Sequence, residues 1–219
     1  MKIESNILKY HLRNVYFIGG NACGGKTTMS KLIAQKYGFY LYNEDEHYGI
    51  HRAIANDNSQ PAMCYQRVDF EKNLNRPVDE YIKWTQDSLK EQSEMVIIDL
   101  IKLSENQIVV ADVLFTPDYI DEIVDKDHAI FLTTNYDLLR SVYFNRPEKK
   151  EFYNCVMSLS NPEKTFQNIF RTLEEANKLE NHIIRNSKFN YIQRDEKSSI
   201  KNTLRLIEKY FGLSEQDEK

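Results

Sequence analysis

The sequence predicts a three-layer α/β fold, in which a five-stranded parallel sheet carries helices on both faces and a helical lid. Short apolar runs rich in β-branched and aromatic residues alternate with longer amphipathic segments, as in a parallel sheet with helical crossovers. A glycine-rich turn also separates the first apolar run from the first amphipathic segment. At 219 residues the chain is long enough to bury a full core. We therefore expect one domain spanning 1–219.

The predicted elements follow in the order that this fold class requires. Strands are expected at 15–18, 39–42, 108–115, 129–133 and 189–193, and helices at 27–37, 91–104, 117–124, 137–144, within 148–186 and at 199–211. The second strand is expected to end in a carboxylate-rich loop, followed by a polar, irregular stretch. We interpret 47–95 as an insertion that covers a substrate, and 140–186 as the lid and a helical segment.

One stretch of the sequence allows two assignments. Residues 95–98 and 108–111 are both apolar runs that end in an aspartate, Asp99 and Asp112 respectively. Only about eight residues would connect them as strands, fewer than the dozen or so that a parallel crossover needs. One run must therefore be helical, and the three-and-four spacing of apolar residues favours the first. Asp112 is then the preferred carboxylate at a strand end, with Asp99 as the alternative.

Composition excludes several classes of protein. The formal net charge of −4 argues against broad nucleic-acid binding, which needs a basic surface. No apolar stretch approaches the roughly 18 residues that a membrane helix requires, and the amino terminus lacks the pattern of a secretory signal. Cys23, Cys64 and Cys155 fit neither a disulfide framework nor a zinc site, and are expected to be reduced thiols. We expect a cytoplasmic protein of unspecified oligomeric state.

The glycine-rich turn matches a specific phosphate-binding motif. The segment from Gly20 to Thr27 satisfies G-x-x-x-x-G-K-S/T between a predicted strand and a predicted helix, which is the context of a P-loop. Its backbone N–H groups and the positive end of the helix dipole favour phosphate, so we expect ATP with Mg²⁺ in a P-loop NTPase fold. Lys26 should reach the β and γ phosphates, and the Thr27 hydroxyl, with Asp112, should hold Mg²⁺. The expected nucleotide-binding residues are Gly20, Asn21, Ala22, Cys23, Gly24, Gly25, Lys26, Thr27 and Thr28.

Four segments together resemble the P-loop small-molecule kinases, such as shikimate kinase, gluconate kinase and chloramphenicol phosphotransferase. They are 20–28, 42–47, 109–112 with Pro117, and 140–146. The resemblance implies an enzyme that transfers the γ-phosphoryl group of ATP to a hydroxyl or a phosphate of a small-molecule acceptor.

The resemblance also implies roles for individual residues. Asp45 occupies the position of the acidic residue that contacts the acceptor hydroxyl, and would accept its proton. Asn43 replaces the first of two aspartates in shikimate kinase, so that part of the pattern is missing. Arg140 and Arg146 lie where lid arginines fold over the phosphates, with Arg146 preferred. Lys149, by contrast, is expected to be solvated.

Two other functions are compatible with the P-loop. One is an ATPase or GTPase switch without a small-molecule acceptor, although the chain lacks the N-K-x-D base-reading motif that such GTPases usually carry. The other is a kinase-like toxin acting on a nucleotide sugar. If the protein is a kinase, the acceptor would be recognised by residues of the insertion. Candidates are Tyr48, Arg52, Arg67 and Trp84.

Overall fold

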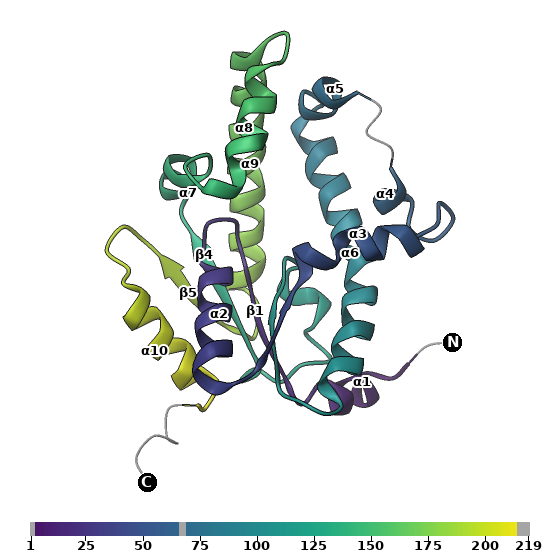
Figure 1. The fold of residues 1–219 in the computed structure, drawn as a ribbon, viewed down its shortest axis with the longest axis vertical. Coiled ribbons are helices and arrows are strands. Elements are labelled where there is room, and N and C mark those ends of the chain that lie inside the picture. Colours follow the sequence, from purple (N-terminus) through teal and green to yellow (C-terminus); the bar gives the residue numbers. More distant parts are fainter. Residues whose placement is uncertain (1–2, 66–68, 214–219) are drawn as a thin grey trace.

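The computed structural model of the protein describes residues 3–65 and 69–213. Its centre is a sheet of five parallel strands in the order β2-β3-β1-β4-β5 (Figure 1). The strands are β1 (Val15–Gly20), β2 (Tyr40–Asn43), β3 (Val109–Asp112), β4 (Ala129–Thr134) and β5 (Asn190–Arg194). The predicted five-stranded parallel sheet is confirmed.

Helices cover both faces of this sheet. The covering helices are α2 (Lys26–Tyr37), α6 (Val78–Ser104), α9 (Pro162–Arg185) and α10 (Ile200–Tyr210). Phe17 of β1 belongs to an apolar cluster that includes residues of α6 and α9, while its neighbour Ile18 belongs to a second cluster with residues of α2 and α10. Because successive strand residues point to opposite faces, the two clusters lie on the two sides of the sheet. The fold has the three layers predicted.

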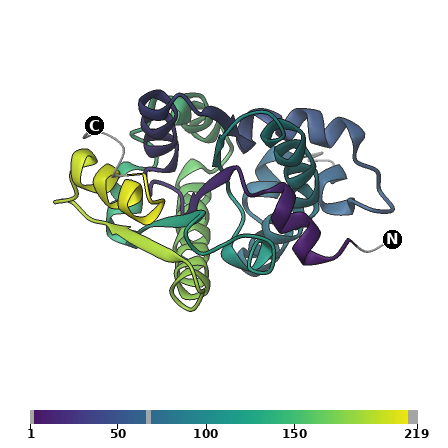
Figure 2. The same cartoon turned by 90° about the horizontal axis from the view of Figure 1, so that it is seen from below.

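Different elements form the two ends of the molecule. Seen from below, β5 and α10 lie at one end, and α1 (Ser5–His11) lies at the other (Figure 2).

In the register of the sheet, Ile18 pairs with Asp112, and Asp112 pairs with Asn43. The carboxyl ends of β1, β3 and β2 therefore lie side by side, and the loop after β1 opens next to them. Ligands of open parallel sheets bind at such an edge.

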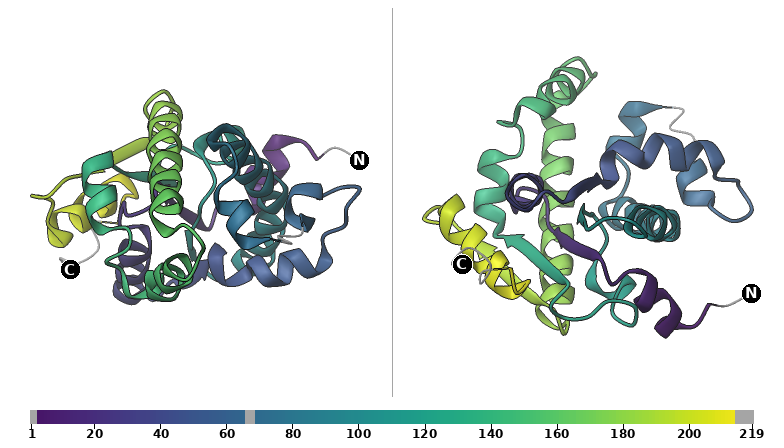
Figure 3. Two further views of the ribbon diagram at one scale, coloured as in Figure 1. Left: turned by 90° about the horizontal axis from the view of Figure 1, so that it is seen from above. Right: turned by 60° about the horizontal axis from the view of Figure 1, so that its bottom comes forward.

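Two helical arms extend beyond this edge. The first contains α3 (Glu44–Ile54), α4 (Pro61–Cys64), α5 (Phe70–Leu74) and the amino-terminal part of α6, and the second contains α7 (Tyr136–Val142), η2 (Pro147–Lys149), α8 (Lys150–Met157) and the start of α9 (Figure 3). A separate apolar cluster joins them through Leu74, Val156 and Ile169. Asn75 also donates a hydrogen bond to Thr165 Oγ1, at 2.8 Å. The arms therefore touch far from the sheet.

Several predicted elements differ from the structure. The acidic stretch is the first turn of α3 rather than a loop, because Asn43 Oδ1 accepts from the Asp45 N–H and caps this helix. Strand β3 ends at Asp112 instead of 115, and 117–124 contains only the short 3₁₀ helix η1 (Pro117–Tyr119) and turns. The run 95–98 lies inside α6, as the helical spacing of its apolar residues favoured. Within the described ranges, no helix is both long and apolar enough to cross a membrane.

Candidate active site

The glycine-rich loop adopts a backbone that only certain residues tolerate. Gly20 has φ +121°, Gly25 has φ +98° and Cys23 has φ +62°, so the chain turns through left-handed conformations three times. A Cβ atom on Gly20 or on Gly24 would lie 2.0 or 2.4 Å from the carbonyl oxygen of Leu132 in β4. The glycines therefore serve both the turn and its close packing on the neighbouring strand.

Lys26 is the first residue of α2 and points back into this loop. Its Nζ donates to the carbonyl oxygens of Gly20, at 2.8 Å, and Asn21, at 3.1 Å. The side chain is 8% exposed. The Asn21 amide in turn donates to Glu180 Oε2 of α9, at 2.7 Å. The loop is therefore held from inside by one ammonium group and from outside by α9.

Thr27, in the first turn of α2, meets Asp112, the last residue of β3. The Thr27 hydroxyl donates to Asp112 Oδ2 at 2.6 Å. Burial raises the pKa of Asp112, whereas Lys26 and the hydrogen bond from Thr27 oppose that shift. Asp99 lies elsewhere, on α6, where its Oδ2 accepts from Tyr42 and contacts His51. Of the two candidate carboxylates, only Asp112 lies beside the P-loop threonine.

A cavity of about 620 Å³ begins at the P-loop and continues between the two arms. This volume lies within the range of small-molecule sites. Its lining residues come from the loop, the start of α2, α3, α6, the end of β3 and the residues after it, the segment around η2, α9 and β5. They are Asn21, Ala22, Cys23, Gly25, Lys26, Thr27, Thr28, Asp45, Tyr48, Tyr81, Trp84, Thr85, Ser88, Leu89, Gln92, Asp112, Leu114, Tyr143, Arg146, Glu148, Lys149, Leu173 and Arg194. Asp45 and Arg146, 101 positions apart in the sequence, thus share one cavity with the P-loop.

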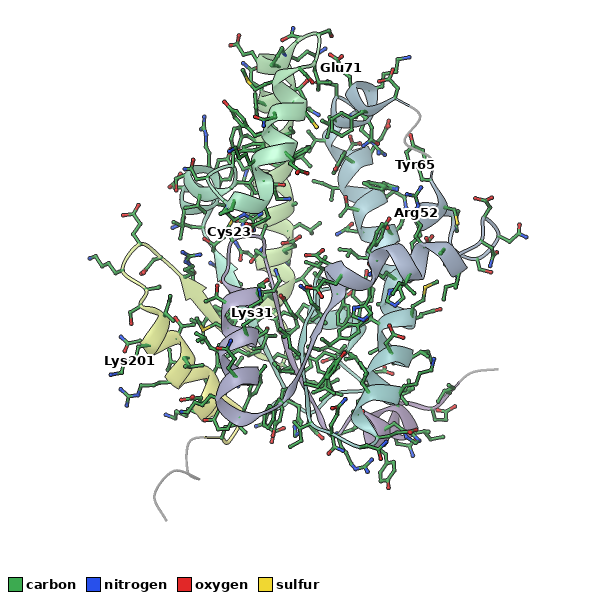
Figure 4. All side chains as sticks on the ribbon, in the orientation of Figure 1. Cys23, Lys31, Arg52, Tyr65, Glu71 and Lys201 are labelled. Atoms are coloured by element: carbon green, nitrogen blue, oxygen red, sulfur yellow. The ribbon has the colours of Figure 1, made fainter. Side chains whose placement is uncertain are left out.

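The end of the cavity beside the P-loop, called the phosphate end below, is strongly cationic. Arg146, Arg194, Lys26 and Lys149 all act electrostatically on Cys23, whose pKa is nevertheless raised because burial outweighs them. Arg194 Nη1 also donates to the Cys23 carbonyl oxygen at 2.7 Å, which attaches the end of β5 to the loop. Figure 4 labels Cys23 in the loop before α2. Four cations around one loop suit a polyphosphate.

Lys149 and Arg140 both differ from expectation. Lys149 lines the cavity instead of being solvated, and burial together with the nearby Arg146 lowers its pKa. Arg140 is absent from the cavity wall, and its guanidinium lies 5.4 Å from the centre of the Phe170 ring. Only Arg146 of the two predicted arginines therefore lies with the P-loop. Arg146 is held by an ion pair with Glu148, at 3.5 Å.

The opposite end of the cavity is lined by α3 and α6. Asp45 and Tyr48 come from α3, and α6 contributes side chains at three- and four-residue spacing along one face. These α6 residues are Tyr81, Trp84, Thr85, Ser88, Leu89 and Gln92. Of the predicted acceptor contacts, Tyr48 and Trp84 lie here, Arg52 is exposed outside the lining (Figure 4), and Arg67 falls outside the described residues.

Glu44 is a buried carboxyl that the sequence analysis did not single out as functional. It begins α3, is 0% exposed, and its Oε2 accepts from the Leu114 N–H at 2.6 Å. Its Oε1 has no hydrogen-bond partner among the described residues. Burial raises the pKa of Glu44 to about 8, and the nearby Asp45 adds to this shift. Glu44 therefore joins the start of α3 to the chain just beyond Asp112.

Comparison with known proteins identifies the architecture. No protein-family model matches the sequence, and no curated protein matches it. The structure of shikimate kinase from Acinetobacter baumannii in complex with shikimate matches with a TM-score of 0.51 and 14% identity, covering 92% of this chain and 95% of that one. This chain has a P-loop small-molecule kinase fold. The predicted resemblance is confirmed for the fold.

Two further structures match this P-loop kinase fold less closely. An uncharacterized protein from Eubacterium ventriosum ATCC 27560 has a TM-score of 0.42 at 12% identity, covering 90% of this chain and 97% of its own. Deoxyadenosine kinase from M. mycoides with bound dCTP has a TM-score of 0.40 at 15% identity, covering 90% and 98%.

Proposed function

We propose that the protein is an ATP-dependent kinase that phosphorylates a hydroxyl or a phosphate of a small-molecule acceptor. The observation that carries this proposal is the single cavity that runs from Lys26 to the wall formed by α3 and α6. A P-loop alone would suit any nucleotide-binding protein. A second wall, with a carboxylate and aromatic side chains facing the loop, is what an acceptor of the phosphoryl group needs.

At the phosphate end, the residues act by position and charge. The N–H groups of the loop and the amino terminus of α2 would bind the phosphate oxygens, and Lys26 would move from the loop carbonyls to the β and γ phosphates. Arg146 and Lys149 would bind the migrating phosphoryl group from the opposite side of the cavity.

Thr27 and Asp112 supply the oxygen ligands that suit Mg²⁺. A hydroxyl and a carboxylate in direct contact, beside a phosphate-binding loop, match the ligand preference of this ion. Among residues 3–65 and 69–213 there is no cluster of three or more His, Cys, Asp or Glu side chains that could bind a metal without the nucleotide. When bound, Mg²⁺ would neutralise charge on the transferring phosphate.

At the acceptor end, Asp45 is the proposed base. It lies in the first turn of α3 and lines the cavity opposite the loop, and its backbone N–H is fixed by the Asn43 cap. In this position it would orient the acceptor hydroxyl and accept its proton as the phosphoryl group arrives. Because the transition state is largely dissociative, position matters more than basicity for this residue.

ATP consumption, measured with Mg²⁺ across hydroxy acids, sugars, nucleosides, nucleotides and phenicol or aminoglycoside antibiotics, tests the proposal. We expect one acceptor class to stimulate ADP formation. Lys26→Ala and Asp45→Asn should each lower this stimulated rate by at least about 10²-fold. Lys31→Ala, on the same helix as Lys26, and Glu46→Gln, next to Asp45, are the matched controls because neither residue lines the cavity.

The outcome also decides between the kinase and a nucleotide-dependent switch. ATP hydrolysis that no acceptor stimulates, and that is equal in wild type and Asp45→Asn, would rule out the kinase. A product in which the acceptor carries the γ-phosphate, detected by mass spectrometry, would establish the transfer.

A further inference from the structure

A chain of buried polar side chains leads from the surface of α6 to the acceptor end of the cavity. His51 of α3 is 2% exposed, and its Nε2 lies 2.8 Å from Asp99 Oδ2. On the other side of the ring, His51 Nδ1 lies 3.4 Å from Gln92 Nε2, which also donates to the Glu44 carbonyl oxygen at 3.5 Å. Gln92 is 1% exposed and lines the cavity.

The atoms around Gln92 determine which way its amide points. The Glu44 carbonyl can only accept a hydrogen bond, so the side-chain atom facing it is the NH₂ group. His51 Nδ1 must then accept from the same NH₂ group, which agrees with a proton on Nε2 that is donated to Asp99. The carbonyl oxygen of Gln92 is consequently directed away from both, and no described residue donates to it.

We propose that the Asp99–His51 pair fixes Gln92 with its oxygen facing the cavity, and that Gln92 selects a neutral, planar acceptor that carries a hydrogen-bond donor. This inference rests on the proposed kinase function and specifies its acceptor. Gln92 would contact the acceptor directly. His51 and Asp99 are positioning residues, since they act through Gln92.

The rest of the acceptor wall supports the same class of molecule. Tyr48, Tyr81 and Trp84 supply aromatic surface to the cavity, and the Arg76 guanidinium lies 5.1 Å from the centre of the Tyr81 ring and 4.8 Å from that of Trp84. The cations of the cavity lining all lie on the loop, around η2 or on β5, and none comes from α3 or α6. Asp45 is the one charged residue of this wall, and it would repel a carboxylate or a phosphate. Nucleosides with an exocyclic amino group combine a flat ring, a donor and hydroxyl groups.

The test uses the single tryptophan of the chain, Trp84, as a reporter inside the cavity. Its fluorescence is titrated with cytidine and with the 2-pyrimidinone riboside, which lacks only the amino group, and in parallel with adenosine and purine riboside. A saturating non-hydrolysable ATP analogue with Mg²⁺ is present, so that the nucleoside is not reported from the P-loop. Shikimate serves as the anionic probe.

We expect the amino member of at least one pair to bind at least about 10-fold more tightly than its partner, because Gln92 would otherwise face no donor. Gln92→Met should reduce this ratio to about 1, while Gln86→Met, the same substitution on α6 outside the cavity, should leave it unchanged. His51→Phe should also lower the ratio in the wild-type background, but should have no further effect on it in Gln92→Met.

This double-mutant cycle separates positioning from stability. A merely structural role of His51 would weaken both members of a pair equally and leave their ratio intact, which would overturn the proposal. Failure of all four nucleosides to bind, or tighter binding of shikimate, would overturn the proposed acceptor class. None of these readings requires phosphoryl transfer, so they are independent of whether turnover is observed.

Discussion

The two ends of the cavity are built in different ways. The phosphate end depends mainly on one continuous loop, from Gly20 to Thr27, whose backbone would supply most of the groups that bind the phosphates in the proposed function. The acceptor end has no such loop, and consists of side chains from α3 and α6 that packing brings together. Phosphates are the same in every nucleoside triphosphate and can be bound by a fixed local motif, whereas the acceptor requires a wall that each protein assembles for itself.

The largest effect should come from the cations that complete the phosphate end. Arg146→Ala should lower kcat by about 10³-fold, because an arginine on a migrating phosphoryl group stabilises the transition state by several kcal/mol. Arg140→Ala should change kcat by less than about 3-fold, because Arg140 packs on Phe170 outside the cavity. Steady-state kinetics of both variants provide the measurement. Equal losses would show that the lid rearranges to bring Arg140 inward.

A smaller loss of kcat is expected at the proposed Mg²⁺ ligands. Asp112→Asn should reduce kcat by about 10²-fold and raise the Mg²⁺ concentration needed for half-maximal rate, because an amide is a weaker ligand than a carboxylate. Asp99→Asn is the comparison, since it removes a carboxylate that lies on α6 away from Thr27. A Mg²⁺ titration should therefore shift in the first variant only. A shift in Asp99→Asn would indicate instead that Asp99, the alternative candidate, binds the metal.

The buried carboxyl of Glu44 predicts how the stability of the protein changes with pH. Its folded-state pKa of about 8 lies above the ordinary value of 4.5, so the folded protein keeps a proton that the unfolded chain loses. The stabilising contribution of the protonated carboxyl is complete below about pH 4.5 and is lost as the pH rises toward about 8.

Glu44→Gln removes this titration while keeping an acceptor for the Leu114 N–H. Relative to wild type, the free energy of unfolding of the variant should increase with pH by on the order of 3 kcal/mol between pH 5 and pH 8. Urea titrations at several pH values, without nucleotide, measure this difference. A constant difference across that range would mean that Glu44 is already ionised in the folded protein.

The smallest expected effects are changes in the free energy of unfolding, and they should have opposite signs at the two ends of the cavity. Gly25→Ala should destabilise the protein by about 1 kcal/mol, because Gly25 has φ +98° and alanine is strained there. Gly49→Ala should stabilise it by roughly 0.5–1 kcal/mol, because Gly49 lies in α3 with open space around its Cα. Thermal unfolding of both variants tests this contrast, and two changes of the same sign would contradict it.

The same contrast explains what could be predicted from the sequence. The P-loop is a short motif with a physical reason for each residue, so its location between β1 and α2 was predictable. The choice of a helix for 95–98 was also correct, because connection length and apolar spacing both favoured it. Asp45 and Arg146 were expected to be functional from a family resemblance, and the structure shows that they share the cavity.

Other residues required the tertiary structure. Gln92 and Lys149 look like ordinary polar residues in the sequence, and only packing makes them part of the cavity wall. A signal for the α6 wall did exist, since positions 81, 84, 85, 88 and 92 follow helical spacing, but that spacing does not say what the helix faces. The acidic stretch was misassigned as a loop because the Asn43 cap that begins α3 was not recognised, and the contact of Glu44 with Leu114, 70 positions away, was visible only in the tertiary structure.

One unbroken helix, α6, joins the acceptor wall to the centre of the fold. Its 27 residues span about 40 Å, with Trp84 at the cavity and Leu100 in the main apolar cluster beside the sheet. A helix without a break has no hinge at which its outer part can melt independently. The free energy of acceptor binding is therefore added to the unfolding free energy of the whole molecule, and true acceptors should raise its melting temperature in proportion to the logarithm of their concentration.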